Sequence, residues 1–396
     1  MADVSTPARS SHDFAAHRVR GGGTTIFAEI TALAIEHGAV NLGQGAPDFD
    51  APESVRDAAR RAIDAGRNQY ATSTGETALR EAIARHSARF YGETLDPVRE
   101  ITVTTGATEA LFCAAMAFVD PGDEVIVFEP TYDSYVPGIR MAGGTPVPVA
   151  LRAPDFRFDP DELRAAFTPR TRVIYVNTPH NPTGTVFNDE ELELLAALCI
   201  EHDVLAVTDE VYEHIVFSGA THRRLSSLPG MRERTLTISS AGKTFSATGW
   251  KIGWTLGPEP LQRAIRGVHQ WTTFATSTPM QHAMAEALDL PDSYYQTLRD
   301  DYEARRDFLM DVVAATPLVP IRPDGSYFIV AGIDGMGHAD ARSFARWMAT
   351  DVGVAVIPCS SFYLDSREGD RYVRLCFCKG WPTLEAAAER LRTLSA

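Results

Sequence analysis

Residues 235–251 read TLTISSAGKTFSATGWK, and this stretch changes character within a few positions. The β-branched run Thr235–Ile238 predicts a strand, and the residues that follow it are mostly small or hydroxylated, with two lysines among them. Most lysines are solvated surface charges, but a lysine enclosed by glycine, alanine and aromatic side chains gives up its proton more easily. Lys243 is therefore a candidate nucleophile or base just beyond the end of a strand.

Other runs of the same kind precede this one along the chain. They are Ile101–Thr104, Glu124–Phe128, Val173–Val176 and Val204–Val207, with helical patterns such as Thr108–Val119 and Asp189–His202 between them. Runs that are almost continuously apolar are typical of strands covered on both faces. The order strand, loop, helix predicts an α/β fold with a mainly parallel, doubly wound sheet. In such sheets ligands bind beyond the carboxyl ends of the strands.

A polar loop follows each of these runs, and each loop has a structural and a functional interpretation. Residues 105–108 form a glycine turn before a helix, which suits a phosphate group, although Thr108 could simply cap the helix. Tyr132 could stack on a planar ring or belong to the core. Asn181 lies in a rigid turn with two prolines and a glycine, where its amide has a defined position. Asp209 is either a helix cap or a buried carboxylate that awaits a cationic partner.

The pattern changes after about residue 290. A long charged helix is expected at Ser293–Ala315, followed by helices and strands that do not alternate regularly: strands Tyr327–Val330, Val354–Ile357 and Tyr372–Phe377, and helices Ala339–Asp351 and Leu384–Leu394. We therefore predict a large domain of residues 51–289 and a smaller α+β domain built from residues 1–50 and 290–396. Within the latter, residues 1–23 are polar and rich in glycine, and we expect them to form a mobile tail.

Charge and cysteine content exclude several classes of protein. The 37 basic and 52 acidic side chains give a net charge of −15, which argues against nucleic acid or an anionic membrane as the main partner. The five cysteines are scattered and odd in number, so we expect reduced thiols rather than a disulfide framework.

No apolar run approaches the roughly 20 residues of a membrane span, and the N-terminus has no apolar signal core. Histidines lack metal-ligand spacing. These features predict a cytoplasmic protein without a metal site.

Taken together, the loop sequences resemble a known family. From about Thr24 to its end the chain is similar to fold-type I pyridoxal-phosphate enzymes of the class I/II aminotransferases, in the branch of the kynurenine–glutamine and bacterial methionine aminotransferases. Six segments carry the resemblance: Asn41–Asp48, Asn68-Gln69-Tyr70, Asn177–Gly184, Thr208–Tyr212, Ser239–Trp254 and Tyr372–Phe377. No single segment is specific, but the combination is.

The resemblance implies a role for each of these loops. Lys243 would bond covalently to the pyridoxal phosphate cofactor, Asp209 would keep the ring nitrogen protonated, and Tyr212 and Asn181 would bind the ring oxygen. Tyr132 would stack on the ring. The phosphate would be bound by Ala107, Thr108, Ser240 and Lys251, with Tyr70 reaching in from a partner subunit of a homodimer with shared active sites. Arg374 would bind the substrate carboxylate, helped by Asn181 and the backbone of Gly45.

The expected activity is the transfer of an amino group between an L-amino acid and a 2-oxo acid. The amino acid would be neutral, sulfur-containing, glutamine-like or aromatic. Two alternatives stay open: an N-succinyldiaminopimelate-type substrate, and β-lyase or oxidase chemistry with the same cofactor. The resemblance further suggests that Ile26 or Phe27, Tyr135 and Phe274 line the side-chain pocket. Ala46 replaces the large apolar residue usual in this branch, which bears on side-chain selectivity.

Overall fold

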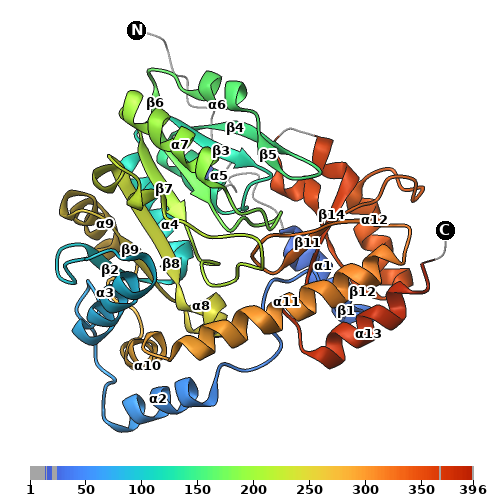
Figure 1. The fold of residues 1–396 in the computed structure, drawn as a ribbon, viewed down its shortest axis with the longest axis horizontal. Coiled ribbons are helices and arrows are strands. Elements are labelled where there is room, and N and C mark those ends of the chain that lie inside the picture. The colour runs from blue at the N-terminus through green and yellow to red at the C-terminus, as the bar shows by residue number, and fades with distance from the viewer. Residues whose placement is uncertain (1–13, 15, 20–24, 365–366, 395–396) are drawn as a thin grey trace.

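The computed structural model describes residues 14, 16–19, 25–364 and 367–394. Two sheets organise these residues (Figure 1): a large one covered by helices on both sides, and a smaller one at the other side of the molecule. The long helix α11 (Asp292–Ala314) runs from the neighbourhood of the large sheet to the small one. The predicted α/β fold with a mainly parallel large sheet is confirmed, whereas the domain boundaries stay a prediction.

The large sheet has eight strands in the order β2-β9-β8-β7-β6-β3-β4-β5. Pairing is parallel from β8 through β7, β6 and β3 to β4, while β9 runs antiparallel to both of its neighbours. The strands are β2 (Ile101–Thr105), β3 (Glu124–Glu129), β4 (Thr145–Arg152), β5 (Arg157–Phe158), β6 (Thr171–Asn177), β7 (Leu205–Asp209), β8 (Thr235–Ser240) and β9 (Ile252–Leu256).

The expected strands are present in this sheet, and β4, β5 and β9 are additional. All residues of β3 are buried, as expected for a strand between two parallel neighbours with helices on both faces. The sequence pattern does not predict β4, because the strand contains Pro146 and Pro148 and proline has no N–H to donate to a neighbouring strand. The sheet accommodates them near its edge, where β4 pairs with β3 and the two-residue β5.

Helices pack against both the large sheet and the strands of the smaller region. They are α1 (Ile26–Glu36), α2 (Glu53–Asp64), α3 (Thr77–Tyr91), α4 (Gly106–Phe118), α5 (Tyr135–Ala142), α6 (Pro160–Ala166), α7 (Asp189–Glu201), α8 (Ala241–Thr244), α9 (Glu259–Thr272), α10 (Thr278–Leu288), α12 (Ala341–Trp347) and α13 (Trp381–Leu391). The predicted N-terminal segment 1–23 lies mostly outside the described residues; within it, His17–Val19 forms a short 3-10 helix.

The small sheet has the order β10-β11-β14-β13, with all its pairs antiparallel. Its strands are β10 (Val319–Ile321), β11 (Phe328–Gly332), β13 (Ile357–Pro358) and β14 (Tyr372–Cys376). A separate pair joins β1 (Val40–Asn41) to β12 (Val354–Ala355) in parallel, so an early and a late segment of the chain pair here.

Two expectations for this region are wrong in detail. The predicted helix Ala339–Asp351 is not uniform, because α12 ends at Trp347 and continues as a π-helix through Met348–Val352. The predicted strand Val354–Ile357 divides into β12 and β13, which belong to different sheets. An apolar run of four residues cannot reveal such a division, since all four are buried either way.

The cysteine prediction is confirmed: all five are free and buried. No helix within the described ranges is long and apolar enough to cross a membrane. In the same part of the chain, no group of three or more histidine, cysteine, aspartate or glutamate side chains could hold a metal ion.

Candidate active site

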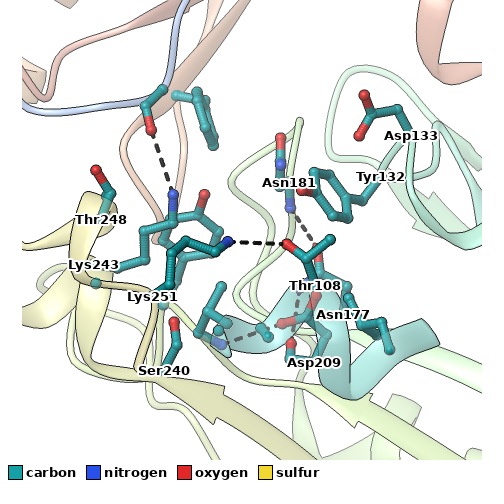
Figure 2. Close-up of a pocket in the computed structure, with 18 of the residues that line it drawn as sticks. Thr108, Tyr132, Asp133, Asn177, Asn181, Asp209, Ser240, Lys243, Thr248 and Lys251 are labelled. Atoms are coloured by element: carbon teal, nitrogen blue, oxygen red, sulfur yellow. Dashed lines mark hydrogen bonds between the residues drawn. The ribbon is translucent and has the colours of Figure 1, made fainter. Parts of the chain in front are cut away.

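A cavity of about 290 Å³ lies beyond the carboxyl ends of β2, β6, β7 and β8, where the small sheet approaches the large one. This is the position expected for a ligand in a parallel α/β sheet. Every residue predicted to bind the cofactor or the substrate carboxylate, except Tyr70, lines the cavity. Figure 2 shows how the loops bring Lys243, Asp209, Asn181 and Tyr132 together from different strands.

Lys243 reaches the cavity from the short helix α8, which begins where β8 ends. Its Nζ lies 3.4 Å from the carbonyl oxygen of Gly45 and 5.6 Å from the centre of the Tyr212 ring. Burial lowers the pKa of Lys243 to about 8, with the charge of Asp209 opposing the shift. A lysine with such a pKa has a substantial neutral fraction near pH 7, as a nucleophile requires.

Asp209 is the last residue of β7 and only 4% exposed. Its Oδ2 accepts a 2.7 Å hydrogen bond from the hydroxyl of Tyr135, and its Oδ1 lies 3.4 Å from the backbone N of Val211. Burial raises the pKa of Asp209 to about 6, and the bond from Tyr135 limits the rise. No ion pair is formed by this carboxylate with any residue that the structure describes. A ligand with a protonated nitrogen would supply the missing cation.

Arg374 comes from β14 of the small sheet and is only 2% exposed. Its Nη1 donates to Asn181 Oδ1 and its Nη2 to the carbonyl oxygen of Gly43, both at 2.8 Å. Its Nε has no partner within the described part of the chain. A buried donor without an acceptor is costly, so the guanidinium is suited to a carboxylate ligand. The centre of the Phe328 ring lies 4.1 Å from the guanidinium carbon of Arg374, and the ring shields one face of the guanidinium from water.

The opposite end of the cavity presents donors to an anion. Gly106 has φ +72°, and a Cβ there would come within 3.0 Å of Lys251 Nζ. This turn opens α4, whose first residues include Ala107 and Thr108, so their N–H groups have no partner from a preceding helical turn. Lys251 Nζ lies 3.5 Å from Thr108 Oγ1. Ser240 lines the same end of the cavity (Figure 2).

Aromatic side chains form the walls of the cavity. Burial raises the pKa of Tyr132 to about 12, so its hydroxyl stays protonated. Tyr212 is buried and packs edge-on against Tyr327, whose hydroxyl donates to the carbonyl oxygen of Gly45 at 2.7 Å. Glycine at position 45 lets the backbone lie this close to the aromatic side chains, because a Cβ there would lie 2.8 Å from the Phe328 ring.

The side-chain pocket differs in part from the expectation. Phe27 lines the cavity, but Tyr135 does not: it is buried behind the cavity, where its hydroxyl faces Asp209. Tyr70 and Phe274 stack edge-on 5.6 Å apart on the surface, where Tyr70 is 87% exposed. Trp271, which precedes Phe274 by three residues, is 84% exposed. Within one chain these three aromatic residues do not line the cavity.

Sequence reasoning missed the roles of Tyr135, Tyr327 and Asp133. Tyr135 follows Tyr132 by three residues, and nothing in the sequence tells which of the two faces the cavity. Tyr327 directly precedes β11 of the small sheet and meets Gly45 only through the fold. Asp133 lines the cavity, and its position directly after Tyr132 was the available signal.

Comparison with known proteins decides the family. Residues 37–391 match the family described as aminotransferase class I and II. The chain belongs to that family. It is 44% identical to the methionine aminotransferase of Escherichia coli strain K12 over 94% of this chain and 96% of the relative. It is 41% identical to kynurenine–oxoglutarate transaminase 1 of Mus musculus, covering 96% of this chain and 98% of the relative.

Solved structures of aminotransferases superpose closely on this one. A structure of an E. coli protein identified as a methionine aminotransferase matches with a TM-score of 0.92 and 43% identity, covering 96% of this chain and 99% of the other. The N-succinyldiaminopimelate aminotransferase of Mycobacterium tuberculosis matches with a TM-score of 0.94 and 43% identity, covering 96% and 100%. The protein is therefore a fold-type I aminotransferase of a family that uses pyridoxal phosphate, with amino acids and 2-oxo acids as its substrates.

Proposed function

We propose that this aminotransferase holds pyridoxal phosphate on Lys243 and takes the α-amino group of neutral, sulfur-containing, glutamine-like or aromatic L-amino acids. One observation carries the proposal: Lys243 of α8, Asp209 at the end of β7 and Arg374 within β14 all line the same cavity. The relatives named for methionine and kynurenine support this range of amino donors.

The residues of the cavity fit the cofactor. Asp209 is a buried carboxylate in need of a cation, and the start of α4 with Lys251 offers donors to a phosphate. Tyr132 would lie against the ring, while Asn181 and Tyr212 would donate to its oxygen. Pyridoxal phosphate, when bound, supplies an electron sink for the carbanion formed at the substrate Cα.

The protein side chains then bind the substrate and move its proton. Arg374 would hold the α-carboxylate through the unpaired Nε and an Nη, which fixes the orientation of Cα. Lys243 Nζ would take the proton from Cα and return a proton to the cofactor carbon on the far side of the substrate nitrogen, because its lowered pKa leaves a neutral amine available. Asp209 would keep the ring nitrogen protonated throughout.

A homodimer with shared active sites belongs to the same proposal. The surface contact between Tyr70 and Phe274 and the exposed ring of Trp271 support it, since exposed aromatic side chains are enriched at protein interfaces. Tyr70 would then reach the phosphate end of the partner's cavity.

The test is a visible absorption spectrum of the purified protein with pyridoxal phosphate. Methionine, glutamine or an aromatic amino acid is added first without any oxo acid, and then a 2-oxo acid is added. We expect the amino acid to bleach the visible absorption band of the lysine-bound cofactor. The 2-oxo acid should then restore the band, because the enzyme stores the amino group between the two steps. A band that never bleaches would refute the substrate class. A β-lyase or oxidase would release ammonia without storing the amino group.

The second candidate is an N-succinyldiaminopimelate-type substrate. A probable N-succinyldiaminopimelate aminotransferase of M. tuberculosis is 44% identical to this chain, and this relative favours it. Competition between such a substrate and methionine in the same bleaching assay separates the two candidates.

A further inference from the structure

Lys379 is a buried lysine that does not line the cavity, and no role described so far uses it. It follows the end of β14 by three residues and is only 6% exposed. Its Nζ donates to the carbonyl oxygen of Ala46 at 2.7 Å and to that of Gln44 at 3.1 Å. It forms no ion pair with any residue that the structure describes. A buried ammonium group is costly unless nearby groups compensate it, and here those groups are two backbone carbonyls.

The two carbonyl groups lie on either side of Gly45, which lines the cavity. The peptide unit that joins Gln44 to Gly45 is trans, so its carbonyl and its N–H point in opposite directions. Lys379 Nζ and the thiol of Cys376 both donate to this carbonyl, each at 3.1 Å. The N–H of Gly45 therefore points away from both donors, and it donates to no group in the described ranges. An unpaired N–H at the wall of a cavity is available to a ligand.

The same loop also contacts the guanidinium expected to bind the substrate. Arg374 donates from Nη2 to the carbonyl oxygen of Gly43 at 2.8 Å. Each carbonyl of residues 43–46 is bound by a side chain, and Lys379 binds two of them. Loss of this one side chain would free the carbonyls on both sides of the Gly45 N–H while leaving Arg374 in place.

We propose that Lys379 is a positioning residue for the substrate α-carboxylate. By holding the carbonyls on both sides of Gly45, it keeps the Gly45 N–H directed at the cavity, where this donor binds the carboxylate together with Arg374. The inference rests on the proposed function and deepens it. Every candidate substrate carries an α-carboxylate, amino acids and 2-oxo acids alike, so the role of Lys379 is the same for each side chain. The contacts involved all lie within one chain, and they stay in place whichever residues a partner subunit adds.

The test uses Lys379→Met, which keeps the approximate length of the side chain and removes its ammonium group. Methionine is compared with 3-(methylthio)propylamine, which has the same side chain and amino group but no carboxylate. Each is titrated into the protein loaded with pyridoxal phosphate, and the spectral change of the cofactor gives the dissociation constant. Losing one hydrogen bond to a carboxylate should weaken methionine binding by roughly tenfold. The amine should bind equally to the wild type and to the variant, because it has no group for the Gly45 N–H.

Two further variants separate positioning from a general loosening of the loop. Lys379→Gln keeps one donor without the charge, so it should weaken methionine binding by less than Lys379→Met and spare the amine. Thr383→Val removes a 2.6 Å hydrogen bond from the Thr383 hydroxyl to Asp48 Oδ2, which is another contact between the same two segments. It should change the affinity for neither ligand.

A purely structural role for Lys379 predicts something different. Equal weakening of methionine and the amine in Lys379→Met, or an unchanged affinity for methionine, would overturn the inference. If Lys379→Met does not fold, the comparison in Lys379→Gln decides by the same criterion.

Failure of the proposed function is distinguishable from failure of this inference. A wild type whose absorption band is bleached by no amino acid would refute the proposed substrates. Calorimetry with hydrocinnamate, a carboxylate without an amino group, would still decide the role of Lys379, because its binding needs no turnover. Hydrocinnamate should bind the wild type roughly tenfold more tightly than Lys379→Met. Equal binding to both proteins, or binding to neither, would overturn the inference about Lys379.

Discussion

The contact between Tyr135 and Asp209 leads to a prediction that the structure makes quantitative. Tyr135→Phe removes one hydroxyl, which donates a 2.7 Å hydrogen bond to Asp209 Oδ2. The ring itself packs against Tyr132 and Tyr175, and phenylalanine preserves that packing. The variant should therefore fold normally and lose a single polar contact to a buried carboxylate.

The size of the effect follows from the charge on the acceptor. A hydrogen bond to a charged group contributes about 1.5–3 kcal/mol, which corresponds to roughly ten- to hundredfold in an equilibrium constant. Without it the pKa of Asp209 rises further above its already elevated value of about 6. The carboxylate then competes for the proton that it should leave on the ring nitrogen, so the electron sink weakens. We expect kcat to fall by about ten- to hundredfold while KM changes little.

Steady-state kinetics and a pH titration of the visible band form the assay. Tyr175→Phe is the matched control, since its hydroxyl lies 3.5 Å from the Leu111 carbonyl oxygen and does not touch Asp209. The band of Tyr135→Phe should titrate at a different pH from that of the wild type, and that of Tyr175→Phe at the same pH. If both variants behave alike, the reasoning about Tyr135 is refuted.

Two further predictions concern Arg374 and Lys243. Arg374→Lys keeps a positive charge but loses the two-pronged geometry, so kcat/KM for methionine should fall by about 10–100-fold with an unchanged visible band; equal kcat/KM would show that the carboxylate binds elsewhere. The folded protein lowers the pKa of Lys243 to about 8, whereas the unfolded chain restores about 10.4, so the unfolded state binds more protons between these values. The free energy of unfolding of the cofactor-free wild type should thus rise by up to roughly 3 kcal/mol, relative to Lys243→Met, as pH increases through this range. Urea unfolding of both proteins measures the difference, and parallel pH profiles would contradict the burial of this amine.

Much of the large sheet could be predicted because the sequence carries two signals at the end of a strand. Each run such as Val173–Val176 is apolar, and the turn formers after it announce both the end of the strand and the edge where ligands bind. Strand β4 escaped this reasoning because Pro146 and Pro148 are tolerated only where the sheet is near its edge. The long-range pairing of β1 with β12 has no local signal either.

The site was predictable where its residues share a sheet edge and not where they meet across the fold. Asp209 ends β7 and Lys243 follows β8, its neighbour in the same sheet, so strand order alone brings them close. Arg374 comes from the small sheet, and only the family resemblance pointed to it. The contact of Tyr135 with Asp209 depends on how the loop after β3 turns, which residue types do not specify.

The central claim is that the amine of Lys243 holds the cofactor. Borohydride treatment of the protein loaded with pyridoxal phosphate makes the lysine–cofactor bond permanent, and peptide mass spectrometry then locates it. The account predicts the label on Lys243, with none on Lys251, the other lysine that lines the cavity. Prior incubation with an amino acid substrate should prevent labelling, because the substrate amine displaces the lysine. A label on Lys251, or on no lysine of the cavity, would contradict the account.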